Sequence, residues 1–356
     1  MSFATEEGLL ETFIEKFQQI QPHIMTGWNI EGFDIPYLLN RIARVLGGGA
    51  ERALSPVGVI NYREGLDKWF IEGVSILDYM LLYKKFTMGE RPSYRLDAIG
   101  KFEVDLGKIE YEGNLDQLFA TDIDKFIEYN LVDVELVVDM DKKLQFIDTA
   151  RGICHAGHVP YEDFVYSSKY LEGALLTYLK RKGIVAPNKP ADRQERMQAI
   201  RDNNEEKFIG AYVKAPIVGK YDWIYDLDLT SLYPSIIMTI NISPETKIGK
   251  IRDWDAQAYL KDERDYWYIG EDKISKENFK KYLEKSKFSV ASNGVLYRTD
   301  KVGCIPDILD TWFSQRVEFK NKMKEYGNSG EKQKYEWYKK RQLVQKILLN
   351  SLYGVL

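Results

Sequence analysis

The stretch DLTSLYPSII, residues 228–237, is the part of the sequence that decides the fold. Its first residue, Asp228, ends an apolar segment, residues 223–229, which we predict to be a β-strand. Asp226 has the same parity and would lie on the same face of that strand. Residues with hydroxyl groups follow, and then Tyr233 next to a proline. A single aspartate at a strand end is more often a cap or turn residue than a metal ligand, so the whole stretch has to be considered.

As a whole, DLTSLYPSII closely resembles motif A of family B DNA polymerases. In that family the aspartate binds both catalytic Mg²⁺ ions and the next carbonyl binds one, which implies metal-binding roles for Asp228 and Leu229. The backbone amides of Ser231 and Leu232 would face the triphosphate of an incoming dNTP. Tyr233 would lie under the sugar and exclude a 2′-hydroxyl. The alternative for this tyrosine is simple packing against its neighbouring proline.

A second signature, KILLNSLYG, ends the predicted helix 331–353. Lys346, Asn350 and Tyr353 follow the spacing i, i+4, i+7 and therefore share one face of a helix. The segment resembles motif B of the same family. That resemblance implies that Lys346 and Asn350 contact the triphosphate, whereas Tyr353 and Gly354 border the templating base pair.

The preceding predicted helix, residues 306–326, carries two more cations. Arg316 and Lys320 are four residues apart and share a face. Because a Gly-Asn-Ser-Gly turn separates the two helices, we expect them to pack antiparallel and to bring these cations opposite Lys346. In the T-even-like bacteriophage branch of the family, an Arg and a Lys at these places clamp the phosphates. The alternative is a solvated basic stripe.

Residues 26–41, TGWNIEGFDIPYLLNR, resemble the Exo II motif of the family's proofreading nuclease. The resemblance implies that Asp34 holds a metal ion, and that Asn29 and Phe33 line the site for the single-stranded DNA end. The residues alone allow another interpretation, in which Asp34 caps the helix that Pro36 begins.

Residues 129–133, YNLVD, resemble the Exo III motif. Tyr129 and Asp133 are spaced i, i+4 on a predicted helix, so the hydroxyl and the carboxylate share a face. The resemblance makes Asp133 a metal ligand and Tyr129 the residue that orients the attacking water.

Strand and helix patterns alternate through the first 150 residues, which is typical of an α/β domain. The expected fold class is α/β and α+β multidomain: an RNase-H-like 3′–5′ exonuclease domain followed by a partial palm and two-helix fingers. The expected bounds are 1–152 for the exonuclease domain, 153–215 for a connector, 216–305 for the palm and 306–356 for the fingers. Within them we predict helices at 6–20, 36–46 and 123–150, strands at 24–28 and 74–77, a hairpin at 57–71, a helix from 236 and an α+β insertion at 251–305.

Two further segments match the family only by their position. The hairpin at 57–71 lies where the phage polymerases carry a strand-separating hairpin, and residues 208–211, FIGA, resemble the linker motif between nuclease and polymerase. Cys154, His155 and His158 provide only three neighbouring soft ligands, which disfavours a zinc site.

Composition excludes several classes of protein. The 356 residues have a net charge of −4 and no run of 18 apolar residues, so no transmembrane helix is predicted. An acidic N-terminus without a basic region argues against a secretory signal. Two cysteines make no disulfide framework, which indicates a reducing compartment, here the cytoplasm of a phage-infected cell. Residues 311–346 hold ten Lys/Arg against four Asp/Glu, a local basic surface or simply two solvated amphipathic helices.

The resemblance implies template-directed addition of dNTPs to a primer 3′-hydroxyl by two-metal Mg²⁺ catalysis, with proofreading. Implied partners are primer–template DNA, a sliding clamp and a single-strand-binding protein. The Exo I carboxylates would precede residue 1, and the second polymerase carboxylate motif and the thumb would follow residue 356. We therefore expect little activity from the isolated chain, and assembly with complementary polymerase polypeptides. A split gene, an intein-interrupted gene or a partial sequence would each explain this. Alternatives are a non-catalytic DNA- or nucleotide-binding scaffold and a stand-alone nuclease.

Overall fold

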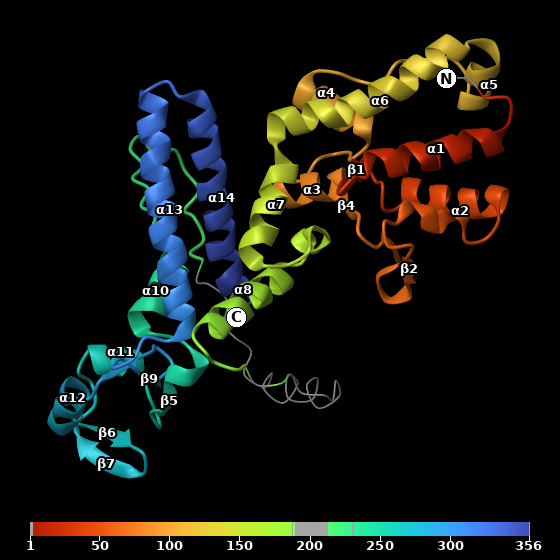
Figure 1. Cartoon of the computed structure of the whole chain (residues 1–356). Coiled ribbons are helices and arrows are strands. Elements are labelled where there is room, and N and C mark those ends of the chain that lie inside the picture. Colours follow the sequence, from red (N-terminus) through yellow and green to blue (C-terminus); the bar gives the residue numbers. More distant parts are fainter. Residues whose placement is uncertain (1–2, 88, 187, 189–212, 230, 356) are drawn as a thin grey trace. The chain divides into compact units, whose positions relative to one another are not determined.

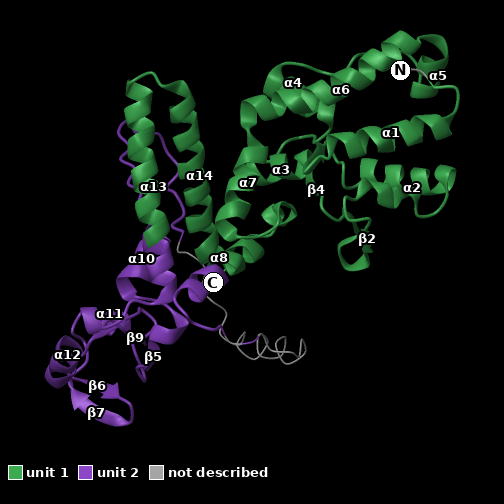
Figure 2. Ribbon diagram, in the orientation of Figure 1, with its two compact units in different colours: residues 1–174, 311–356 green, residues 175–310 purple. Residues whose placement is uncertain are grey.

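The chain folds into two compact units (Figure 2), which are described separately. The structure is a computed structural model that describes residues 3–87, 89–186, 188, 213–229 and 231–355. Unit 1 comprises residues 1–174 and 311–356, and unit 2 comprises residues 175–310. The FIGA segment, residues 208–211, lies outside the described residues, as does most of the end of the predicted connector.

Unit 1 begins with a small layered α/β arrangement (Figure 1). A parallel pair of strands, β1 (Ile24–Gly27) and β4 (Ser75–Asp78), runs beside helices α1 (Glu6–Ile20) and α2 (Asp34–Leu46). The helices bury the apolar residues that recur at helical spacing, and these form one cluster with side chains of the strands. The cluster is made of Leu10, Phe17, Ile30, Ile35, Leu39, Ile42, Leu54, Ile71, Val74 and Ile76.

The predicted hairpin is confirmed. Strands β2 (Ile60–Arg63) and β3 (Lys68–Ile71) pair antiparallel, with Ile60 opposite Ile71. A 3-10 turn, η2 (Glu64–Leu66), joins them, and Asp67 closes it in the left-handed conformation. Another 3-10 helix, η1 (Ala50–Leu54), lies between α2 and the hairpin.

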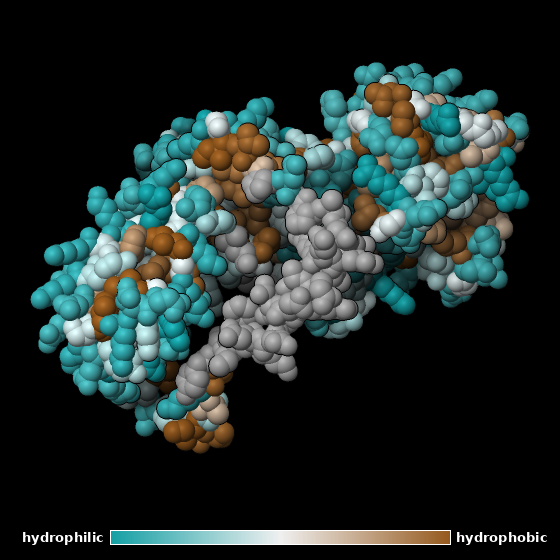
Figure 3. All heavy atoms as spheres, turned by 90° about the horizontal axis from the view of Figure 1, so that it is seen from below, coloured by the Kyte–Doolittle hydropathy of each residue, from teal (hydrophilic) through white to brown (hydrophobic). Residues whose placement is uncertain are grey.

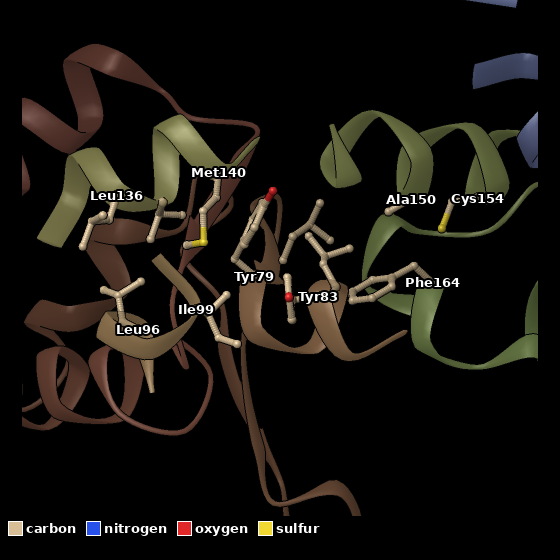
Figure 4. Packing of buried hydrophobic residues seen from close by; sticks show 12 residues of the cluster. Tyr79, Tyr83, Leu96, Ile99, Leu136, Met140, Ala150, Cys154 and Phe164 are labelled. Carbon is tan, nitrogen blue, oxygen red and sulfur yellow. The ribbon is translucent and has the colours of Figure 1, made fainter. Parts of the chain in front are cut away.

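A second cluster of buried residues supports the helices that follow (Figure 4). Tyr79 and Tyr83 of α3 (Tyr79–Phe86) lie at its centre, between side chains of α4 (Leu96–Val104) and α6 (Ile123–Leu144) on one side and Ala150, Cys154 and Phe164 on the other. The last three belong to α7 (Phe146–Gly157) and η3 (Tyr161–Val165). The short helix α5 (Leu115–Thr121) precedes α6 and starts with a capping box, in which Asn114 is the N-cap residue.

The prediction of one helix over 123–150 is wrong, because the helix breaks at Gln145. This residue has φ 56°, so α6 ends at Leu144 and α7 starts at Phe146 in a new direction. Asp141 stabilises the break: its Oδ1 accepts hydrogen bonds from the backbone N–H of Ile147 (3.2 Å) and the hydroxyl of Tyr79 (3.1 Å).

The two long C-terminal helices, α13 (Cys304–Asn328) and α14 (Lys332–Val355), run antiparallel over residues 311–355, as predicted. Near the turn the rings of Tyr326 and Tyr338 are stacked with centroids 5.4 Å apart. Further along, Gln345 Nε2 donates to Gln315 Oε1 at 2.9 Å.

The other face of α14 packs on α7. A Cβ added to Gly152 would lie 2.8 Å from Val344 Cγ2, so the glycine permits the close approach of these two helices. The hydroxyl groups of Ser351 and Tyr170 also form a hydrogen bond of 3.0 Å, which fastens α14 to the first part of α8 (Ser167–Arg181).

Unit 2 contains the predicted small α+β region. A three-stranded antiparallel sheet and a separate hairpin surround a core that includes Trp254, Trp267 and Phe279. The sheet has the order β5 (Lys247–Lys250), β9 (Val295–Arg298), β8 (Phe288–Val290), and the hairpin is β6 (Tyr266–Ile269) with β7 (Asp272–Ser275). The helical elements are α10 (Leu232–Ile240), η5 (Pro244–Thr246), α11 (Ala256–Leu260) and α12 (Lys276–Lys285).

The prediction of a strand at residues 223–229 is not confirmed. The segment forms no strand, and its large side chains are exposed, Trp223 to 93%. Apolar and aromatic residues favour a strand only where a neighbouring strand offers hydrogen bonds and a surface to pack on, and no described segment pairs with these residues.

On the face drawn in Figure 3, the described residues are mainly hydrophilic and the hydrophobic ones form separate patches. None of the described helices has the length and apolarity needed to cross a membrane.

Candidate active site

A cleft of about 1010 Å³ in unit 1 collects the residues predicted for the nuclease. The loop before α2 and the start of that helix contribute Asn29, Phe33 and Asp34, and α6 contributes Tyr129 and Asp133. These five side chains come from segments about a hundred residues apart, and the fold places them around one opening. Their individual roles remain predictions.

The buried carboxylate of Asp78 holds backbone groups of residues that line this cleft. Asp78 is the last residue of β4 and caps α3, where it accepts from the backbone N–H of Met80 at 2.9 Å. The same carboxylate accepts from the backbone N–H groups of Asn29 (3.2 Å) and Glu31 (3.3 Å). It therefore holds the loop that leads into Asp34.

The backbone decides between the two interpretations of Asp34. This residue is the first of α2, the N-cap position belongs to Phe33, and no side chain caps the helix, so the alternative of Asp34 as a cap is wrong. Partial burial, together with the nearby charge of Asp78, raises the pKa of Asp34. A cation beside Asp34 would stabilise the charged form of its carboxylate.

Lys108 is a cleft residue that the sequence patterns did not reveal. Its ammonium donates to Asp133 Oδ2 at 2.5 Å and to the hydroxyl of Tyr129 at 3.0 Å. Burial disfavours the ammonium charge, but these two hydrogen bonds outweigh it and raise the pKa of Lys108. The backbone of Lys108 is fixed by its N–H, which donates to Asp97 at 2.8 Å. One cation therefore lies between the predicted metal ligand and the predicted water-orienting hydroxyl.

The chemistry of the donors fits a divalent cation in part. Asp133 Oδ1 is buried and makes no hydrogen bond with any described residue, and Asp34 provides a second carboxylate in the same cleft. Among the described residues, however, no group of three or more His, Cys, Asp or Glu side chains has the geometry to hold a metal ion. Asp34 and Asp133 are thus the two predicted ligands in a cleft whose lining also includes Asp97 and Glu110.

Aromatic side chains stand at the mouth of the cleft. Phe33 is 64% exposed, and its ring is stacked on that of Tyr37 with centroids 6.1 Å apart and planes inclined by 13°. Inside, the ring of Tyr111 meets that of Tyr129 edge to face at 5.3 Å. Exposed flat rings of this kind are platforms on which unpaired bases stack.

The hairpin is fastened to the same loop. Lys68 of β3 donates to Glu31 Oε1 at 2.5 Å, and both side chains are largely buried. Burial raises the pKa of Glu31 and the ammonium of Lys68 opposes this shift. The predicted strand-separating hairpin thus shares a loop with the nuclease residues.

The residues predicted for nucleotide transfer lie in both units. In unit 2, Asp228 and Leu229 belong to the exposed segment without regular structure, and so does Asp226. Ser231, with φ 54°, is the N-cap residue of α10, so Leu232 and Tyr233 occupy the first turn of a helix that begins earlier than the predicted residue 236. This first turn presents the backbone N–H groups of a helix start.

The remaining transfer residues lie in unit 1. The hydrogen bond between Gln315 and Gln345 joins α13 to α14 one residue before Arg316 and Lys346. The Nε atom of Arg316 is buried and has no hydrogen-bond partner among the described residues. Four further predicted residues are exposed: Lys320, Asn350, Tyr353 and Gly354.

Three features would have been hard to find from sequence. Lys108 lies in a polar loop with no motif around it, Asp78 reads as an ordinary helix cap, and Tyr111 follows no spacing rule. Cys154, set aside as a zinc ligand, is buried, and its thiol lies 3.6 Å from the carbonyl oxygen of Tyr161.

Comparison with known proteins identifies the family of the chain. Residues 165–356 match DNA polymerase family B, and residues 1–99 match the exonuclease domain of DNA polymerase family B. The DNA-directed DNA polymerase of Escherichia phage RB69 is 33% identical over 337 residues, which is 93% of this chain and 34% of the relative. The corresponding enzyme of Enterobacteria phage T4 is 32% identical over 329 residues, 91% of this chain and 34% of the relative. DNA polymerase 1 of Pyrococcus abyssi is 26% identical over 363 residues.

The chain spans about a third of the length of the phage relatives. The polymerase match alone covers more than half of the chain, and the exonuclease match covers the segment that holds Asp34. The chain belongs to DNA polymerase family B.

Proposed function

We propose that the chain is the central part of a DNA-directed DNA polymerase with a 3′–5′ proofreading exonuclease. The observation that carries the nuclease part is the single cleft lined by Asn29, Phe33, Asp34, Tyr129 and Asp133. In this proposal residues 1–152 form a partial RNase-H-like exonuclease domain, 153–215 a connector, 216–305 a partial palm and 306–356 the fingers.

In the nuclease cleft, an unpaired DNA 3′ end would stack on the exposed ring of Phe33, with Asn29 beside it. Asp34 and Asp133 would hold Mg²⁺, which supplies neutralisation of phosphate charge and lowers the pKa of a bound water. The hydroxyl of Tyr129 would orient the attacking water. Lys108, 3.0 Å from that hydroxyl, would place a further positive charge where charge develops on the phosphate.

For nucleotide addition, Asp228 and the carbonyl of Leu229 would hold Mg²⁺, and Tyr233 would select deoxyribose. The amides of Ser231 and Leu232 would face the triphosphate of the dNTP. The cations Arg316, Lys320 and Lys346 would bind its phosphates, with Asn350, Tyr353 and Gly354 nearby. The proposed partners are primer–template DNA, a sliding clamp, a single-strand-binding protein and complementary polymerase polypeptides. The proposed location is the cytoplasm of a phage-infected cell.

The second candidate is a non-catalytic DNA- or nucleotide-binding part of a split polymerase. It is favoured by one observation: the described residues contain no cluster of three metal ligands. In this candidate the isolated chain would bind DNA without turnover, because a two-metal reaction needs both ions held by clustered carboxylates.

The two candidates differ in an assembled polymerase. Asp228→Ala should abolish primer extension while DNA binding is retained, and Asp133→Asn should abolish 3′–5′ hydrolysis while extension is retained. If both variants keep the wild-type rates of primer extension and 3′–5′ hydrolysis, the result supports the non-catalytic scaffold. An assembled polymerase that binds no primer–template DNA would contradict both candidates.

A further inference from the structure

A second cavity, of about 640 Å³, lies in unit 1 between α7 and α14 and shares no lining residue with the nuclease cleft. Three fixed cations line it, Arg151 from α7 and Lys340 and Arg341 from α14, against a single carboxylate, Asp148. Its volume lies within the range of small-ligand sites. The cavity therefore combines room for a ligand with an excess of positive charge.

The single carboxylate does not neutralise this charge. Asp148 pairs with Lys340 at 2.8 Å and with Arg151 at 3.3 Å, so two cations share one anion. Arg341 has no carboxylate within ion-pair distance among the described residues, and its guanidinium lies 4.3 Å from the ring centroid of Trp337. A multiply charged anion is the ligand that this arrangement favours.

Aromatic and amide groups complete the cavity. Trp337 lines it and is 46% exposed, so part of its ring remains open to a ligand beside the stacked Arg341. Gln345 also lines it: its Nε2 is used by Gln315, but its buried Oε1 makes no hydrogen bond with any described residue. A buried acceptor without a partner is unfavourable, and a ligand N–H would satisfy it.

The cavity lies on the opposite side of α14 from the predicted nucleotide contacts. Arg341 and Asn350 are nine residues apart, which is half a turn beyond two full turns of an α-helix. Arg341 and Leu348 are seven apart and share a face, and Leu348 is fully buried. A ligand in this cavity is therefore not the dNTP of the predicted transfer site.

We propose that the α7–α14 cavity is a binding site for single-stranded DNA, with phosphates on Arg151, Lys340 and Arg341 and a base stacked on Trp337. Cations that follow a backbone, joined to an aromatic platform, are the general means of holding an unpaired strand. An acidic peptide would satisfy the cations, but it would leave the indole platform without a flat partner. The proposal rests on the proposed DNA-directed function and adds a second strand-binding site to it.

The test uses the purified 356-residue chain and a short circular single-stranded oligodeoxynucleotide, labelled for fluorescence anisotropy. A circle has no 3′ end to enter the nuclease cleft, so it reports on other sites. Trp337→Leu should weaken binding of the circle about tenfold, the usual loss when one stacking ring is removed, with an unchanged salt dependence. Arg341→Gln should instead reduce the slope of log affinity against log salt by about 0.7, the value for one lost phosphate contact.

Arg252→Gln is the matched control, because Arg252 lies 5.2 Å from the ring centroid of Tyr268 on the surface of unit 2. It should change neither the affinity nor the salt slope. In a second measurement, photocrosslinking of a circle that carries 5-iododeoxyuridine should label the tryptic peptide that contains Trp337. Thermal unfolding of each variant at the wild-type temperature shows that the fold is intact.

Four outcomes would overturn the proposal. In the first, the circle binds equally well to all variants and a linear strand also binds. This result would rule out the site at the α7–α14 cavity and leave the proposed function intact. A poly-glutamate peptide that displaces the circle at equal concentration, with both binding independently of Trp337, would assign the cavity to an acidic protein. If free dATP binds in a Trp337-dependent way and the circle does not, the cavity is a mononucleotide site. Absence of binding by both circular and linear strands would contradict the proposed function itself.

Discussion

Lys108 Nζ lies 2.5 Å from Asp133 Oδ2, so a loop residue and a helix residue meet as an ion pair inside the nuclease cleft. This ion pair has two consequences for the cleft. It keeps one oxygen of the predicted metal ligand occupied, and in the proposed nuclease it would place a cation beside the DNA phosphate.

Lys108→Met should therefore weaken binding of a linear, 3′-ended single strand and reduce the salt slope by about 0.7. In an assembled polymerase it should lower the rate of 3′ hydrolysis about 100-fold, since one charge that stabilises the transition state is lost. Anisotropy titrations at several salt concentrations and single-turnover hydrolysis measure the two effects. Lys142→Met removes an exposed cation of α6 that is paired with Asp139, and it should change neither quantity. Equal salt slopes for both variants would exclude a phosphate contact at Lys108.

Asp78→Ala should destabilise unit 1 by about 2–4 kcal/mol, because it removes a helix cap and leaves buried backbone N–H groups without an acceptor. Hydrogen exchange should accelerate in the loop 28–34, and this local effect separates a positioning role from general destabilisation. Asp255→Ala, which removes the exposed cap of α11, should cost about 1 kcal/mol and leave exchange in that loop unchanged. Slow exchange in the loop of the Asp78 variant would mean that other contacts hold it.

Alkaline pH should destabilise the chain through Cys154. Burial raises the pKa of this thiol to about 12, above the value of about 8.5 for an exposed cysteine. As the pH rises past the lower value, the unfolded chain loses the thiol proton first, so the free energy of unfolding falls progressively until the higher value is reached. Cys154→Ala should flatten this decline by up to about 1.4 kcal/mol per pH unit. Urea unfolding between these pH values measures the slope. Ile153→Val, a change at the neighbouring buried residue without a titrating group, should keep the wild-type slope.

The contact between Glu31 and Lys68 should couple the hairpin to the nuclease loop. A double-mutant cycle with Glu31→Gln and Lys68→Met should give a coupling energy of about 1–2 kcal/mol, since both side chains are largely buried. The same cycle on the exposed pair of Asp139 and Lys142 should give about 0.3–0.5 kcal/mol. Similar values for the two pairs would show that the hairpin is held by other contacts.

The parts of the fold that could be predicted are those with local signals. Helix α2 and the hairpin strands follow from apolar spacing and turn residues, and the antiparallel pair α13–α14 follows from its glycine turn. The segment 223–229 has strand composition, but a strand depends on neighbours that composition does not describe. No glycine or proline marks the break at Gln145. The side chain of Asp141 stabilises it instead, and the sequence pattern does not reveal that contact.

The candidate site divides in the same way. Asp34, Tyr129 and Asp133 are recognisable because each lies in a motif, whereas Lys108 acquires its place only when its loop folds against α6. Whether Asp34 capped a helix could not be decided until the backbone showed Phe33 in the cap position.

Gln145 alone links α6, which carries the predicted nuclease ligand Asp133, to α7, on which α14 rests. The helix that carries this predicted ligand and the helix that supports α14 are thus consecutive in the chain and are joined at a single residue. Asp141 of α6 holds this junction, because its carboxylate accepts hydrogen bonds from the backbone N–H of Ile147 and the hydroxyl of Tyr79. The direction of α7, and with it the surface on which α14 packs, is therefore set by the backbone conformation of one residue, Gln145.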